Sequence, residues 1–140
     1  MAVIDASVYI AWINAQEPEH ASSWAWLEAA RAAREPLVAP VILLAEIAAA
    51  LSRGMENERL AQQAAEQLEH GGLVELIPVT LALAARAAKI AANHRIRGCD
   101  SIYVALAEQR GERLVTLDQQ QLQRAAEVVR TLHPCVSRKQ

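Results

Sequence analysis

Short apolar segments alternate with longer helical segments along this chain. The short segments are rich in Val, Ile, Leu and Ala, the composition of strands that are buried in a parallel sheet. This pattern predicts strands at residues 2–4, 37–39, 73–79 and 113–117, and a fifth at 127–132. Element boundaries drawn from a single sequence shift by several residues.

The intervening segments carry helix start and stop signals. Ser7 and Thr80 stand where N-caps are expected, Pro40 at a helix start, and Gly54 and Gly111 at helix ends. We predict helices at residues 8–13, 18–34, 41–53, 58–70, 81–94, 100–110 and 119–126. In the second helix, Trp24 should share a face with Leu27, and Trp26 should face another way; we expect the three tryptophans, at 12, 24 and 26, in the core or an interface.

Strands that alternate with helices predict an α/β fold. We expect a three-layer sandwich with a central, mostly parallel sheet of four to five strands. The length of 140 residues suits one domain, and no linker or internal repeat divides it. We therefore predict a single domain over residues 1–135 and a frayed polar tail at 136–140.

Composition and charge narrow the class of protein. Hydrophobic residues make up 53% of the chain and aromatic residues 4%, and the net charge is −2. A nucleic-acid partner would therefore need a local basic patch or metal ions. Cys99 and Cys135 form no metal-ligand spacing, and without a signal peptide two thiols suit a reducing compartment. The apolar run at 37–51 is too short to span a bilayer, so we expect a cytoplasmic protein without a membrane segment.

Four acidic residues stand at informative places in this pattern. Asp5 and Asp118 end predicted strands, Asp100 opens a predicted helix, and Glu46 is the one charge in the apolar run 41–51. Parallel strands bring their carboxyl ends to one edge of the sheet, where α/β proteins bind their ligands. No Lys or Arg is adjacent to any of the four.

Each acid also has an ordinary structural explanation. Asp5, Asp100 and Asp118 could be helix caps or turn residues, which Asp favours. Glu46 could be exposed at a helix edge or paired with an arginine. The joint pattern is harder to explain in this way, because four converging carboxylates repel one another. Two unit charges about 4 Å apart interact by roughly 4 kcal/mol at an effective dielectric of about 20.

Such a cluster must be protonated or bind cations. Oxygen ligands without Cys or His suit Mg²⁺ or Mn²⁺. These ions polarise a phosphodiester and activate water, so the cluster predicts a hydrolytic nuclease.

Four sequence blocks that contain these acids resemble the motifs of PIN-domain ribonucleases, and most closely the VapC-type toxins of bacterial toxin–antitoxin pairs. The blocks are Val3-Ile4-Asp5-Ala6-Ser7-Val8, Pro40 through Glu46-Ile47, Cys99-Asp100-Ser101-Ile102-Tyr103-Val104-Ala105-Leu106-Ala107, and Leu114-Val115-Thr116-Leu117-Asp118. The resemblance covers nearly the whole chain and implies a PIN-like fold and RNA cleavage that depends on Mg²⁺ or Mn²⁺. It implies that the metal-binding, catalytic carboxylates are Asp5, Glu46, Asp100 and Asp118. Ser7 and Thr116 match the family's supporting hydroxyl positions, although a cap and a strand residue explain them equally.

Two positions depart from the resembled family. Ala49 replaces an Asn that many relatives carry, and Gln119-Gln120-Gln121 replaces a further acid that some carry. A second metal site would therefore be weak. Two other classes of function compete with the nuclease: a PIN-like binding module without activity, and a receiver-like phosphoacceptor domain. The receiver ranks low because no Lys follows the late strand at 113–117.

RNA and protein partners are the last expectation. Lys89, Arg95 and Arg97, together with His94, precede Asp100 and could contact RNA phosphates, or they could be an ordinary solvated helix end. The resemblance implies a homodimer and an antitoxin whose chain wraps a groove near the site. We expect the helices at 41–53 and 58–70 to be walls of that groove, unless they are ordinary core.

Overall fold

The computed structural model describes residues 1–135, and the tail predicted at 136–140 lies outside them. In this part of the chain the sheet has five strands in the order β3-β2-β1-β4-β5, and every pairing is parallel. The strands are β1 (Ala2–Ile4), β2 (Leu37–Pro40), β3 (Val74–Ile77), β4 (Arg113–Val115) and β5 (Thr131–Leu132). The predicted α/β fold with a parallel sheet is confirmed.

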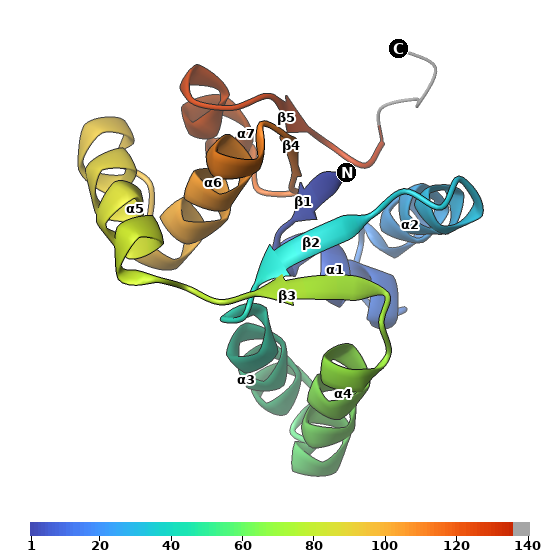
Figure 1. The fold of residues 1–140 in the computed structure, drawn as a ribbon. Coiled ribbons are helices and arrows are strands. Elements are labelled where there is room, and N and C mark those ends of the chain that lie inside the picture. The colour runs from blue at the N-terminus through green and yellow to red at the C-terminus, as the bar shows by residue number, and fades with distance from the viewer. Residues whose placement is uncertain (136–140) are drawn as a thin grey trace.

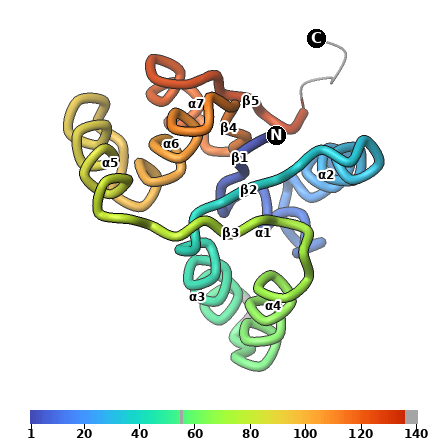
Figure 2. The backbone as a smooth tube through the Cα atoms, viewed as in Figure 1, coloured from blue at the N-terminus to red at the C-terminus, as the bar shows by residue number. Residues whose placement is uncertain are grey.

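Helices cover both faces of this sheet (Figure 1). They are α1 (Ala6–Ile13), α2 (His20–Ala32), α3 (Leu43–Met55), α4 (Glu58–His70), α5 (Leu81–His94), α6 (Gly98–Arg110) and α7 (Gln119–Arg124), which continues into the 3₁₀ turn η1 (Ala125–Glu127). The connections that contain α1 to α4 lie on one side of the sheet, and the connection that contains α5 and α6 lies on the other (Figure 2). None of the helices in this part of the chain has the length and apolarity needed to cross a membrane.

The core is centred on β1 and α6. All three residues of β1 are fully buried, because the strand lies in the middle of the sheet. Helix α6 packs on β1, β2 and β4 and buries a continuous stretch from Tyr103 to Ala107. Gly111 then adopts a left-handed conformation with φ of +64°, which ends α6 and returns the chain to β4, as its position predicts.

Several predicted boundaries are wrong, each for a local reason. Pro40 is the last residue of β2 and does not open a helix, because β2 continues its pairing to Ile77 of β3. Gly54 lies inside α3, and the helix ends when Glu56 turns left-handed. Strand β4 ends at Val115, before Leu117.

The start of α2 is also displaced from its prediction. The helix begins at His20, and Trp26 and Leu27 are both buried, whereas Trp24 is 48% exposed. Trp24 stacks on Trp12 of α1, with ring centroids 6.1 Å apart, at the surface of the protein. The predicted shared face of Trp24 and Leu27 is therefore wrong, because the core side of α2 runs through Trp26, Leu27 and Ala30.

Candidate active site

The order of the strands places a ligand-binding position at the carboxyl ends of β1 and β4. The chain runs from β1 to β2 on one side, and the later strand β4 pairs with the other side of β1. Ligands of α/β sheets bind at such a switch point, where the neighbouring connections leave in opposite directions. Asp5 directly follows β1, and Asp118 lies three residues beyond β4. Asp5 and Asp118, the two acids predicted at strand ends, therefore lie at the same edge of the sheet.

Asp5 is held by hydrogen bonds from both strand ends. The Ser7 hydroxyl donates to its Oδ1 at 2.5 Å, and the Thr116 hydroxyl donates to its Oδ2. The same two hydroxyls accept the backbone N–H groups of Leu117 and Asp118, each at 3.1 Å. Ser7 and Thr116 thus connect the segment after β1 to the segment after β4 and fix the Asp5 carboxylate between them.

These contacts correct two details of the sequence interpretation. Asp5, and not Ser7, is the N-cap of α1, and it accepts the N–H of Val8 at 3.4 Å. Asp100 is the third residue of α6, whose N-cap is Arg97. Asp118 does cap α7, as a turn aspartate would, by accepting the N–H groups of Gln120 and Gln121. Capping and a place in the cluster are compatible, since each carboxylate has a second oxygen.

Burial raises the pKa of Asp5 above the ordinary value of an aspartate. The residue is 4% exposed, and loss of water raises the pKa of its carboxyl from 3.8 to about 6. The hydrogen bonds from Ser7, Thr116 and Val8 act in the opposite direction, and the neighbouring Asp100 adds to the rise. Asp5 is therefore a carboxylate whose ionisation is resisted by its surroundings and favoured by a nearby cation.

Glu46 reaches the same cluster from α3. Its Oε1 accepts a hydrogen bond of 2.7 Å from the hydroxyl of Tyr103, which lies on α6 one turn after Asp100. Burial is the main reason why the pKa of Glu46 is raised, and the charge of Asp100 adds to the rise. The hydrogen bond from Tyr103 and the charge of Arg97 offset part of it. Tyr103 in turn has its own pKa raised by burial and by its bond to Glu46. The apolar helix therefore carries this Glu because a buried tyrosine holds it in place.

Asp100 and Asp118 share one arginine. Arg97 donates from Nε to Asp100 at 2.9 Å and from Nη2 to Asp118 at 3.4 Å. No Lys or Arg is adjacent to the four acids in the sequence, but Arg97 lies three residues before Asp100 and reaches it across the first turn of α6. These pairs also raise the pKa of Arg97, which keeps its positive charge. The Arg97 side chain is 78% exposed, so solvent screens both pairs.

The structure therefore brings together all four predicted carboxylates, although their oxygen atoms do not lie close around one point. In residues 1–135, the one group of three potential ligands whose donor atoms all lie within 4.8 Å of one another is Glu19, His133 and Cys135. The four carboxylates are spaced more widely, with the Arg97 guanidinium between two of them. Their donors are all oxygens, the set that Mg²⁺ and Mn²⁺ accept, so the residues present fit such an ion once Arg97 moves.

The predicted RNA-contact residues separate into two groups. Arg95 and Arg97 line a hollow beside Asp100 and Asp118, to which Arg124 also contributes. Arg124 lies on α7 and donates to the Arg95 carbonyl at 2.7 Å. Lys89 is exposed on α5 and does not line this hollow. Its proposed contact with RNA stays a prediction.

Sequence reasoning missed Tyr103 and Arg124. Tyr103 follows Asp100 by three residues on one helix, so helical spacing alone could have placed both on one face. Arg124 stands in the last turn of α7, where a basic residue is common, and only the tertiary contact to Arg95 shows its place.

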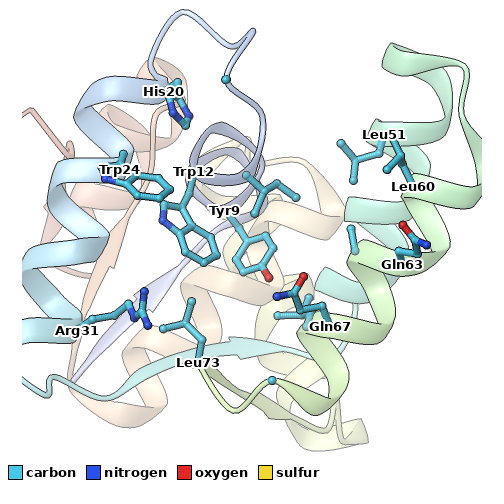
Figure 3. Close-up of a pocket in the computed structure, with 15 residues that line it drawn as sticks. Tyr9, Trp12, His20, Trp24, Arg31, Leu51, Leu60, Gln63, Gln67 and Leu73 are labelled. Atoms are coloured by element: carbon cyan, nitrogen blue, oxygen red, sulfur yellow. The ribbon is translucent and has the colours of Figure 1, made fainter.

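A large apolar groove of about 760 Å³ lies between two pairs of helices. Figure 3 shows Tyr9, Trp12 and Trp24 on one side of it and Leu60 on the other. The first wall is formed by α1 and α2, and the second by α3 and α4, the helices predicted to line a groove. His20 packs on Trp24 with ring centroids 5.8 Å apart.

Comparisons with known proteins agree with this architecture. The crystal structure of FitAcB from Neisseria gonorrhoeae superposes with a TM-score of 0.72 at 24% identity, covering 96% of this chain and 98% of that one. VapC20 of Mycobacterium tuberculosis, described as a sarcin-ricin loop cleaving toxin, gives 0.73 at 19% identity, covering 91% and 95%. A toxin–antitoxin complex from Klebsiella pneumoniae gives 0.67 at 16% identity, covering 96% and 98%.

These structural similarities, all below 25% identity, show a common fold. A comparison with the curated proteins found no match. The comparison with protein families matches residues 2–128 to the PIN domain, a span that includes β1 to β4, all seven helices and the four clustered carboxylates. The chain therefore belongs to the PIN-domain family.

Proposed function

We propose that this protein is an endoribonuclease that depends on Mg²⁺ or Mn²⁺, and that it is the toxin of a type II toxin–antitoxin pair. The observation that carries the proposal is the meeting of Asp5, Glu46, Asp100 and Asp118 at the carboxyl edge of β1 and β4. Membership in the PIN family and the similarity to FitAcB and VapC20 support it. We further propose that the protein acts in the cytoplasm, where its substrate is RNA.

Each residue of the cluster has a separate task in this proposal. A divalent ion held by the cluster would polarise the phosphodiester and lower the pKa of a water molecule bound to it. Asp5 would be the fixed ligand, because Ser7 and Thr116 hold both of its oxygens in one orientation. Tyr103 occupies Oε1 of Glu46 and leaves its other oxygen for the ion. Asp100 and Asp118 complete the set of oxygens.

Arg97 is the residue that must change partners. Without a cation it neutralises Asp100 and Asp118, and an ion between those carboxylates would take over that role. The released guanidinium, already largely exposed, would then be free to contact an RNA phosphate together with Arg95. Arg97 is thus both a competitor of the ion and a candidate substrate contact.

RNA cleavage by single-site variants tests the nuclease. We expect cleavage with Mg²⁺ or Mn²⁺, inhibition by EDTA, and loss of cleavage in Asp5→Asn and Asp100→Asn, both of which should keep the circular dichroism spectrum of the parent. Glu66→Gln is the matched control, since Glu66 is exposed on α4, a helix that carries none of the four carboxylates. Equal cleavage by the parent and both Asn variants would refute the assignment.

The groove is the proposed site for the antitoxin. Its two walls present aromatic and aliphatic side chains, and Trp24 and Leu60 remain 48% and 41% exposed. Exposed large apolar side chains around a groove are typical of protein interaction sites. We propose that an apolar segment of the antitoxin packs between Trp24 and Leu60. We also propose that two copies of the chain form a homodimer, which analytical ultracentrifugation can test.

A PIN-like binding module without nuclease activity is the second candidate. It is favoured by one observation: Arg97 already pairs with Asp100 and Asp118, so these two carboxylates have a counter-charge without an ion. Calorimetric titration with Mn²⁺ separates the two candidates. Binding that is lost in Asp5→Asn supports the nuclease, and absence of binding at millimolar Mn²⁺ supports the binding module.

A further inference from the structure

A second group of potential metal ligands lies away from the carboxylate cluster. Glu19 is the N-cap residue of α2; His133 directly follows β5, and Cys135 lies two residues beyond His133. One donor atom from each residue lies within 4.8 Å of the others. The Cys135 Sγ is 3.8 Å from Oε2 of Glu19, although 116 residues separate them in the sequence. The fold therefore brings together sulfur, nitrogen and oxygen donors from two distant segments.

The spacing of these donors is close to that of a tetrahedral zinc site. Zinc lies about 2.3 Å from a thiolate sulfur and about 2.0–2.2 Å from a carboxylate oxygen, so two such ligands are roughly 3.5 Å apart. The observed 3.8 Å between Sγ and Oε2 needs only a small closure. A site with three protein ligands leaves the fourth position to water.

The imidazole of His133 is held by its own chain segment. Its Nδ1 accepts the backbone N–H of Cys135 at 3.1 Å. A cation that binds Nδ1 would replace this hydrogen bond. His133 is half-buried, and the following Pro134 is buried, which restricts this short segment.

The local contacts of Glu19 leave its carboxylate available. Its Oε2 accepts a hydrogen bond from the Ser22 hydroxyl at 3.1 Å, and it forms no ion pair with a basic residue of the described chain, residues 1–135. The contact with Cys135 is a long one between a carboxylate and a thiol. A divalent cation would satisfy both groups better than they satisfy each other.

We propose that Glu19, His133 and Cys135 bind Zn²⁺ in a site that joins the end of β5 to the start of α2. The donor set separates this site from the carboxylate cluster, because thiolate and imidazole favour Zn²⁺ over Mg²⁺. The start of α2 also carries His20 and Trp24, which line the apolar groove. Zinc at Glu19 therefore stabilises one wall of that groove. This inference does not depend on nuclease activity.

Titration with Co²⁺, a spectroscopic substitute for Zn²⁺, tests the site. A cysteine ligand gives an intense sulfur-to-cobalt charge-transfer band in the near ultraviolet, which carboxylate ligands of the other cluster cannot give. We expect this band to saturate at one Co²⁺ per chain and to disappear when Zn²⁺ is added. The protein is kept reduced throughout, because thiolate is the ligand form.

The two cysteines of the chain provide a matched pair of variants. Cys135→Ser should abolish the band, and Cys99→Ser should keep it, although Cys99 is adjacent to Asp100. His133→Gln and Glu19→Gln should each weaken Zn²⁺ binding by at least about tenfold, the loss that even an outer-shell partner causes. Zn²⁺ should raise the Tm of the parent and of Cys99→Ser but not of Cys135→Ser.

Three results would overturn the proposal: no charge-transfer band in the parent, a band that survives Cys135→Ser, or a band that requires Cys99. The last result would place the ion at the carboxylate cluster. RNA cleavage by the same variants distinguishes the two proposals. If the proposed nuclease is correct, Cys135→Ser should cleave RNA like the parent, because Cys135 is not part of the carboxylate cluster.

Discussion

The metal-free protein should lose stability as the pH rises through the range in which Asp5 ionises. In the folded protein, burial holds the pKa of Asp5 at about 6, compared with 3.8 for the solvated carboxyl. The folded state therefore binds the Asp5 proton more tightly than the unfolded state. The stabilising contribution is complete below about pH 4 and is lost as the pH rises through about 6.

The size of this effect follows from the two pKa values. Between them, the free energy of unfolding falls by up to about 1.4 kcal/mol per pH unit, for a total of about 3 kcal/mol. Asn cannot ionise, so Asp5→Asn removes this dependence while retaining an oxygen that can accept from Ser7 or Thr116. We expect the variant to gain about 3 kcal/mol relative to the parent between pH 4 and pH 7.

Urea unfolding in EDTA at several pH values measures this difference. Glu108→Gln is a control whose pH dependence has the opposite sign. Arg86 lowers the pKa of Glu108, so the ionised Glu108 stabilises the fold and this stabilisation disappears as the pH falls. A constant difference between Asp5→Asn and the parent across this pH range would refute the reasoning. Mn²⁺ at pH 7 should restore stability to the parent and not to Asp5→Asn, because a cation favours the ionised carboxylate.

Three further variants examine the residues around the cluster. Arg97→Gln should leave the Tm of the metal-free protein nearly unchanged, because the Arg97 side chain is 78% exposed, and should tighten Mn²⁺ binding in calorimetry; weaker binding would contradict competition between Arg97 and the ion. Tyr103→Phe removes the hydrogen bond that lowers the pKa of Glu46, so the acid limb of the cleavage profile should shift to higher pH, and an unshifted profile would contradict this. Trp24→Ala should weaken binding of the proposed antitoxin by more than about tenfold, whereas Leu81→Ala, at an 87% exposed position on α5, should not; equal affinities would remove the groove as the antitoxin site.

The sequence predicts most of the fold because its strands are short, apolar and separated by helices. Strands β1 and β2 begin where predicted, and Gly111 and Thr80 mark the end of α6 and the cap of α5. Proline is less informative. Its preference for the first turn of a helix predicted a helix start at Pro40, whereas Pro40 is the last residue of the apolar strand β2. The strand order β3-β2-β1-β4-β5 lies beyond single-sequence reasoning, because it depends on which buried surfaces pair.

The carboxylate cluster was predictable for a different reason. An acid at the end of a buried strand has its position fixed by the backbone, so Asp5 and Asp118 needed only the parallel sheet to meet. Glu46 was conspicuous because a charge on an apolar helix needs a partner. The identity of that partner, Tyr103, was not predictable, because it depends on how α3 and α6 lie relative to each other.

Arg97 shows why adjacency in sequence is a poor guide to neutralisation. Its guanidinium reaches Asp100 because residues three apart face the same side of a helical turn, and it reaches Asp118 because Thr116 and Ser7 hold the two strand ends together. A long exposed side chain can thus span two carboxylates that converge only in the folded protein. The long side chain that makes this contact can also exchange it, because an ion pair whose arginine is 78% exposed contributes little to stability and can yield to a divalent cation.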